Sequence, residues 1–244
     1  MDATLHTITF LGFKGGIGRS ASAAALAHGL AALGYHVALV DAGHAVPLQE
    51  HILSEQRGRG LPPEESSLFK FSERIARSNH TDGRVQYIRA TTAAHLETVI
   101  EQLWCEDWHY AVVDTPAHQT ASVFEAAGQS SLLIIPARYQ VDAIEVRETL
   151  PPEFLERHHL LRCMVVGSDG SEALRAAFAP LMTLATELPC TPTFAHATAR
   201  ETFSDDVEMG DWLASCLAFA HEVVELMPRQ EQLAGHPPTG VFAI

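Results

Sequence analysis

The sequence predicts an α/β fold: a mostly parallel, doubly wound sheet flanked by helices on both faces. The main observation is that short apolar runs of strand length alternate along the chain with segments of helical spacing. Some of these runs, such as 132–135 (Leu-Leu-Ile-Ile), are apolar throughout, which is typical of strands covered on both faces. With 244 residues and 47% hydrophobic content, the chain is large enough for one domain with a substantial core.

The elements can be placed in order along the chain. Strands are expected at 5–11, 35–40, 85–90, 108–113, 131–136, 161–166 and 184–188, and helices at 21–33, 67–78, 92–106, 141–150, 171–182 and 211–227. The helix at 92–106 repeats apolar side chains at helical spacing and has Thr92 as its candidate N-cap. Residues 43–66 hold several prolines and glycines and are expected to form a long surface excursion. We expect a single domain over 1–228 and a flexible C-terminal tail over 229–244.

Composition limits the classes of function. The formal net charge of −14 argues against a generally basic nucleic-acid surface, although a local arginine patch remains compatible with it. The four cysteines are scattered without metal-ligand spacing, and the fourteen histidines form no metal motif, so free thiols in a reducing cytoplasm are expected. No apolar run reaches the length of a membrane span, and no signal segment is expected. We therefore expect a cytoplasmic protein.

The most informative stretch is Phe13-Lys14-Gly15-Gly16-Ile17-Gly18-Arg19-Ser20, which stands between the first strand and the first helix. A strand, a glycine-rich turn and a helix N-terminus form a phosphate cradle, because glycines let backbone N–H groups approach the anion and the helix end adds positive charge. The stretch departs from the P-loop pattern at Arg19, where that pattern has lysine. Lys14, one of only two lysines in the chain, lies inside the loop. The candidate nucleotide-binding residues are Lys14, Gly15, Gly16, Ile17, Gly18, Arg19, Ser20 and Ala21.

Two predicted strands end in aspartate, at Asp41 and Asp114. Ligands of an open parallel sheet bind beyond the carboxyl ends of the strands, so both carboxylates should lie near the glycine loop. Carboxylates in that place hold Mg²⁺, often through water, and a serine hydroxyl such as that of Ser20 adds a ligand. We therefore predict a magnesium site on Ser20, Asp41 and Asp114. For either aspartate alone, a loop-capping role is the alternative.

These segments resemble the ParA/MinD superfamily of P-loop ATPases. Residues 13–20 are similar to its deviant Walker A motif, in which a signature lysine precedes Gly-Gly-x-Gly. Residues 39–41 (Leu-Val-Asp) resemble the end of its second strand, and 112–116 (Val-Val-Asp-Thr-Pro) resemble its Walker B and switch II segment. Residues 199–203 (Ala-Arg-Glu-Thr-Phe), with Gly210 further on, are similar to its late Arg-x-x-Phe segment. The resemblance covers residues 8 to about 226, and within the superfamily it is nearest to the VirC-type accessory ATPases of T-DNA transfer.

The resemblance implies an ATP-driven switch. Members bind ATP with Mg²⁺ and form a sandwich homodimer, so Lys14 is expected to reach the partner's phosphates in the manner of an arginine finger, with Asp41 in a supporting catalytic role and Asp114 at the nucleotide. The implied partners are a second copy of the chain, non-specific DNA and an unidentified cargo protein, in plasmid partition or DNA transfer. MinD-type relatives end in a basic membrane-binding helix, whereas 211–227 carries no lysine or arginine, so no membrane partner is expected.

Two departures from the family predict weak or absent hydrolysis. Arg19 keeps the positive charge of the P-loop lysine, but its planar fork is bulkier and not interchangeable with an ammonium. The family has Asp-x-Asp after its second strand, whereas this chain has Asp41-Ala42-Gly43 and lacks the carboxylate that orients the attacking water. Such a loss costs on the order of 10²–10⁴-fold in rate. Two other functions stay open: a pseudo-ATPase scaffold that acts only through protein contacts, and a metabolic P-loop enzyme, which Lys14 disfavours.

Overall fold

The computed structural model describes residues 5–12, 14–43, 83–117, 120–150, 152, 161–167, 171–178, 181–189 and 206–227. Within them, one sheet has the strand order β3-β2-β4-β1-β5-β6-β7, and its neighbouring strands are parallel. The strands are β1 (His6–Phe10), β2 (His36–Asp41), β3 (Arg84–Arg89), β4 (Tyr110–Asp114), β5 (Leu132–Ala137), β6 (Leu161–Val165) and β7 (Met182–Thr183). The predicted parallel, doubly wound P-loop fold is therefore confirmed.

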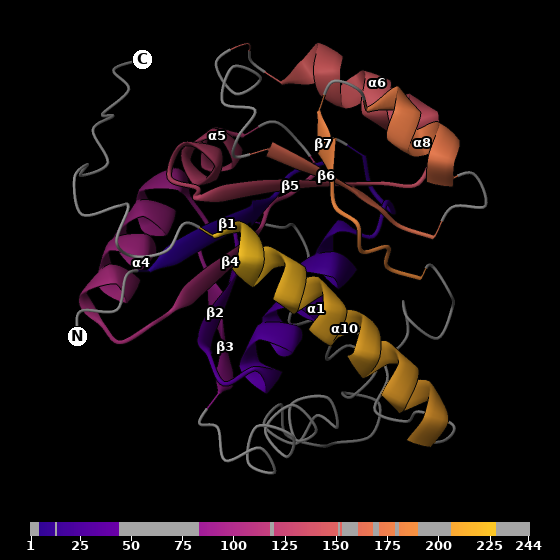
Figure 1. Cartoon of the computed structure of the whole chain (residues 1–244). Helices are drawn as coiled ribbons and strands as arrows, with labels where there is room; N and C mark the ends of the chain where they lie inside the picture. The colour runs from indigo at the N-terminus through magenta and orange to yellow at the C-terminus, as the bar shows by residue number, and fades with distance from the viewer. Residues whose placement is uncertain are drawn as a thin grey trace, which may run out of the picture.

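Helices cover both faces of this sheet (Figure 1). The helices are α1 (Arg19–Ala32), α4 (Ala93–Cys105), α5 (Ala121–Gly128), α6 (Gln140–Thr149), α8 (Ser171–Ala177) and α10 (Asp206–Leu226). Alternate residues of the central strands face opposite layers: Val112 packs in one core with α1 and α10, and Val113 in another with α4. Both layers exclude water from the central strands, which explains why a strand such as β5 is apolar throughout.

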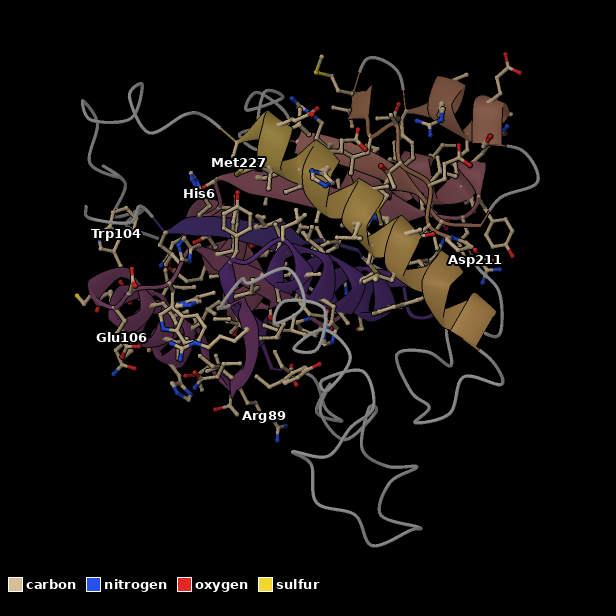
Figure 2. The ribbon with its side chains drawn as sticks, turned by 60° about the horizontal axis from the view of Figure 1, so that its bottom comes forward. His6, Arg89, Trp104, Glu106, Asp211 and Met227 are labelled. Atoms are coloured by element: carbon tan, nitrogen blue, oxygen red, sulfur yellow. The ribbon has the colours of Figure 1, made fainter. Side chains whose placement is uncertain are left out.

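The helix α10 buries its apolar side in the core of the domain. Trp212, Cys216, Phe219 and Val223 are buried in the same core as α1. Figure 2 shows Met227 at one end of this helix, on the side of His6 at the start of β1, and Asp211 toward the other end. Among the described residues, no helix has the length and apolar character needed to cross a membrane.

The structure differs from the predicted elements in several places. The eight-residue helix α5 was not predicted, and α8 ends at Ala177 rather than at 182. No regular strand forms at 184–188. The two ends of this segment are bonded to the sheet: the N–H of Leu184 donates to the carbonyl oxygen of Cys163 at 2.8 Å, and a bridge joins Leu188 to Val166. The reason is that Glu222 of α10 accepts hydrogen bonds from the backbone N–H groups of Ala185 and Thr186, at 2.6 and 2.8 Å, so these groups are not available to a strand partner. The predicted helix 67–78, residues 44–66 of the excursion, the segment 199–203 and the tail 229–244 lie outside the described residues.

The register of the sheet brings the carboxyl ends of four strands to one level. Asp41 pairs with Arg89 on one side and with Asp114 on the other, and Asp114 pairs in turn with Phe10. In Figure 2, Arg89 marks this edge of the sheet and His6 marks the opposite one. The glycine loop follows β1 directly, so it lies at the edge where parallel sheets bind their ligands.

Candidate functional site

The glycine loop turns the chain from β1 into α1. Gly16 and Gly18 have φ values of +78° and +85°, in the left-handed region that favours glycine. Gly18 is the N-cap of α1 and makes no side-chain cap, and its carbonyl oxygen accepts the N–H of Ser22 at 2.8 Å. The N–H groups of residues 19–21 therefore have no partner within the helix. The first turn of α1 also holds no acidic residue that would repel an anion. These features are typical of an anion-binding helix N-terminus.

One side of the loop is anchored in the core and the other side is open. Ile17 is buried, and a Cβ atom on Gly18 would lie 3.0 Å from Cγ1 of Val166. Gly15 and Gly16 are exposed, and a Cβ atom built on either would meet no atom of the described residues within 4 Å. Gly15 and Gly16 therefore offer a phosphate group an open approach to the backbone of the loop.

The two predicted carboxylates lie on neighbouring strands at the base of the loop. Asp41 ends β2 and Asp114 ends β4, and the two residues are register partners. Both are buried, and the N–H of Ala42 donates to the carbonyl oxygen of Asp114 at 2.9 Å. The hydroxyl of Thr115 donates to the carbonyl oxygen of Phe10 at 2.7 Å, which ties the segment after β4 to the end of β1. The arrangement is the one expected from parallel strand geometry, while the role of each carboxylate stays a prediction.

The side chain of Arg19 turns inward. It is only 7% exposed, and its Nε lies 3.3 Å from Oδ1 of Asp114. Its Nη1 donates to the carbonyl oxygen of Gly12 at 2.5 Å. Burial lowers the pKa of Arg19, and the nearby carboxylate of Asp114 opposes that shift. An arginine stays charged at neutral pH, so this is a buried ion pair, and removal of one partner of such a pair typically costs about 3–5 kcal/mol.

Lys14 contacts two acidic residues of α6, to which the sequence assigned no role in the site. Its Nζ lies 2.6 Å from Oε2 of Glu145 and 3.6 Å from Oδ1 of Asp142, both on α6. The hydrogen bond to Glu145 is the main cause that raises the pKa of Lys14. The second oxygen of Asp142 accepts the N–H groups of Arg138 and Tyr139, at 3.0 and 2.9 Å, and so fixes the start of α6. The sequence signal for this contact was the pair of acidic residues, Asp142 and Glu145, one helical turn apart after the fifth strand.

Two further positions bear on the predicted chemistry. The P-loop pattern has a glycine five residues before the position of Gly18, and this chain has Phe13 there. Phe13 is a second departure from the pattern, and it lies outside the described residues. Gly43 has a φ of +91° and lies near the backbone of Ala90 and Thr91, and His44, which could in principle replace the missing carboxylate, lies outside the described residues. Asp41 thus ends β2, and the two described residues that follow it, Ala42 and Gly43, supply no second carboxylate.

The magnesium site predicted on Ser20, Asp41 and Asp114 meets an obstacle in this arrangement. The carboxylate of Asp114 already lies on the guanidinium of Arg19, which is itself a cation. The donor set therefore does not fit a divalent cation at Asp114 while Arg19 lies there. For Ser20 and Asp41 the ligand role stays a prediction. Among the described residues there is also no cluster of three or more histidine, cysteine or acidic side chains that could hold a metal.

The sequence matches no family model and no curated protein. Solved structures nevertheless share its architecture. MinD from Pyrococcus horikoshii, solved with Mg-ADP, is 16% identical with a TM-score of 0.62, and the match covers 91% of this chain and 97% of that one. A plasmid partition protein from Borrelia burgdorferi is 16% identical with a TM-score of 0.56, covering 90% of this chain and 99% of that one.

A third structure with the same architecture is the McdA–ATP complex from Cyanothece. It is 16% identical with a TM-score of 0.53, and the match covers 93% of this chain and 98% of that one. At this level of identity the likeness concerns the fold. The chain therefore has the fold shared by MinD, McdA and plasmid partition proteins.

Proposed function

We propose that this protein is a ParA-like nucleotide switch of the cytoplasm: it binds ATP at residues 14–21, dimerises in the ATP-bound state, and positions or recruits DNA or a protein cargo. The observation that carries the proposal is the open glycine loop at the N-terminus of α1, where a Cβ atom on Gly15 or Gly16 would meet no atom of the described residues within 4 Å. Solved structures of the same fold contain Mg-ADP or ATP, which supports a nucleotide as the anion.

The surface around Lys14 supports the proposed homodimer. The Lys14 side chain is 40% exposed, and Tyr139, Val141 and Ile144 near its α6 partners are 61%, 53% and 45% exposed. Large apolar side chains gathered on a surface mark an interaction site. In the dimer, Lys14 would leave Glu145 for the phosphates of the partner's nucleotide, where its ammonium would stabilise the charge that develops on the γ-phosphate.

Hydrolysis in this switch is weak or absent. Asp41 is the candidate catalytic carboxylate on β2, and it is buried. Gly43, two residues on, cannot orient or polarise water, and the loss of a water-positioning group costs on the order of 10²–10⁴-fold in rate. A slow ATPase keeps its ATP-bound form for longer, which suits a protein whose ATP-bound dimer carries the cargo.

Partition or transfer of DNA is the context that we propose for this switch. Arg84 and Arg89 are exposed at the two ends of β3, and the guanidinium of Arg84 lies 5.0 Å from the centre of the Trp108 ring. The arginines at 57, 59, 74 and 77 lie outside the described residues.

The second candidate function is a pseudo-ATPase scaffold, which is favoured by the inward turn of Arg19, away from the open side of the loop.

The test is a calorimetric titration of the full chain with ATP, together with Gly15→Val. Gly15 has no left-handed φ and open surroundings, so valine there should leave the fold intact and fill the space that a phosphate needs. Gly210→Val is the matched control, because Gly210 is also exposed and unobstructed but lies on α10. We expect micromolar binding, about −8 kcal/mol, for the unchanged protein and the control, and none for Gly15→Val. If the unchanged protein bound no ATP, the nucleotide switch would be rejected in favour of the scaffold. If Gly15→Val bound ATP as well as the unchanged protein, the nucleotide site would not be the glycine loop.

A further inference from the structure

We infer that the Arg19 guanidinium takes the place of a divalent cation beside Asp114, so that the site binds a nucleoside triphosphate without Mg²⁺. The inference rests on the proposed nucleotide-binding function and adds the ionic form of the ligand. It starts from one observation: Asp114, which was predicted to bind magnesium, is paired with the guanidinium of Arg19.

Asp114 is completely buried at the end of β4, between the ends of β1 and β2. A buried carboxylate requires a compensating charge, because its ionised form loses the stabilisation by water. Arg19 supplies that charge from the first residue of α1, with Nε 3.3 Å from Oδ1 of Asp114. The carboxylate is thus neutralised within the chain before any ligand binds.

Two hydrogen bonds from different nitrogens hold the guanidinium in place. The second goes from Nη1 to the carbonyl oxygen of Gly12. The glycine at this position makes the room: a Cβ atom on Gly12 would lie 3.3 Å from Nη1 of Arg19 and 2.5 Å from Cδ1 of Ile17. A planar fork held at two points is fixed in orientation, whereas the single ammonium of lysine at this position could bond only as a point charge.

Magnesium would compete with this arrangement. Mg²⁺ demands near-octahedral oxygen ligands at about 2.0–2.1 Å and usually keeps several waters. Whether it bound Asp114 directly or through water, it would lie beside a fixed guanidinium of like charge. Displacement of Arg19 would cost a buried ion pair, since the side chain is only 7% exposed. The triphosphate charge is instead met by the N-terminus of α1 and by Lys14.

The experiment compares ATP binding by the full chain in excess Mg²⁺ and in excess EDTA, by calorimetry at equal ionic strength. We expect the two dissociation constants to differ by less than about tenfold, or about 1.4 kcal/mol. Binding that is tighter in Mg²⁺ by more than that overturns the inference and leaves the proposed function standing. The absence of ATP binding in both buffers overturns the proposed function, and this inference with it.

Two variants test whether Arg19 is the cause. Arg19→Lys should make ATP binding depend on Mg²⁺ by about tenfold or more, whereas Arg175→Lys, on α8 and paired with Glu187, should change nothing. Should Arg19→Lys fail to fold, Asp114→Asn decides: because Asp114 acts through Arg19, the variant should weaken binding by the same factor in both buffers. If Asp114→Asn lost ATP affinity only in the Mg²⁺ buffer, Asp114 would be a magnesium ligand and the inference would be overturned. ATP binding by Arg19→Lys that did not depend on Mg²⁺ would also overturn it.

Discussion

The close crossing of α1 and α10 predicts that Gly29→Ala destabilises the protein. Gly29 lies on α1, and a Cβ atom on it would be 2.2 Å from the carbonyl oxygen of Cys216 and 3.0 Å from Cβ of Ala220, both on α10. Carbon and oxygen atoms that are not bonded normally approach to about 3.3–3.6 Å, so the backbone of α10 would have to move by about 1 Å. Backbone cannot turn aside as a flexible side chain can.

The magnitude follows from two opposing effects. Overpacking of a filled core costs up to about 3 kcal/mol, and occasionally more. Alanine in place of glycine within a helix returns about 1 kcal/mol. The expected net loss is therefore about 2 kcal/mol in the free energy of unfolding, which for a chain of this size lowers Tm by about 4–8 °C.

Urea and thermal unfolding, followed by circular dichroism, measure this loss. Gly210→Ala is the matched control, because Gly210 also lies within a helix but is exposed and unobstructed. That variant should raise stability by about 1 kcal/mol. If Gly29→Ala proved as stable as the unchanged protein with an unchanged m-value, the described packing of α10 on α1 would be wrong.

Three further predictions concern protonation, Lys14 and capping. Burial lowers the pKa of His28 from 6.5 to about 4, so between these pH values the unfolded chain binds more protons than the folded one and stability falls as the pH falls, by at most about 3.4 kcal/mol. Urea unfolding at pH 7 and pH 4.5 should show a smaller fall for His28→Gln, and an equal fall would contradict the assignment. Glu145→Gln removes the main partner of Lys14, so sedimentation should show ATP-dependent dimers at lower protein concentration than for the control Glu148→Gln on the same helix; an unchanged dimer would mean that Glu145 does not restrain Lys14. Thr92→Ala should cost about 1 kcal/mol in urea unfolding, because the Thr92 hydroxyl caps α4 by accepting the N–H of His95 at 3.1 Å, whereas the exposed Thr98→Ala should cost less.

Local sequence patterns predicted those parts of the structure that depend on local properties. Apolar runs located most of the strands, and the Asp41 and Asp114 positions followed from them, because parallel strands bring their carboxyl ends to one edge. The N-cap at Thr92 was also readable, since its signal lies within one turn of the helix. The strand expected at 184–188 was wrong for a non-local reason. Its apolar residues suit a strand, but Glu222 from α10 accepts hydrogen bonds from the N–H groups of Ala185 and Thr186 in its middle.

The directions of the two loop cations could not be read from the sequence. Whether Lys14 and Arg19 point to a ligand or into the chain depends on where α6 and β4 lie, and these elements are far away in sequence. The distance of 95 residues between Arg19 and Asp114 carries no signal of contact in a single sequence. The same holds for Gly29, whose requirement for a missing side chain arises only where α10 crosses α1.

The different burial of these two cations indicates which of them can respond to a nucleotide. Lys14 is 40% exposed, and its nearer partner Glu145 is 34% exposed. A solvent-exposed ion pair contributes little to stability, so Lys14 can exchange Glu145 for a phosphate at small cost. Arg19 is buried with a fully buried carboxylate and a backbone carbonyl, and exchange there would leave a charge unpaired in the core. Control by nucleotide should therefore act through Lys14 and α6, while Arg19 and Asp114 stay fixed as part of the fold.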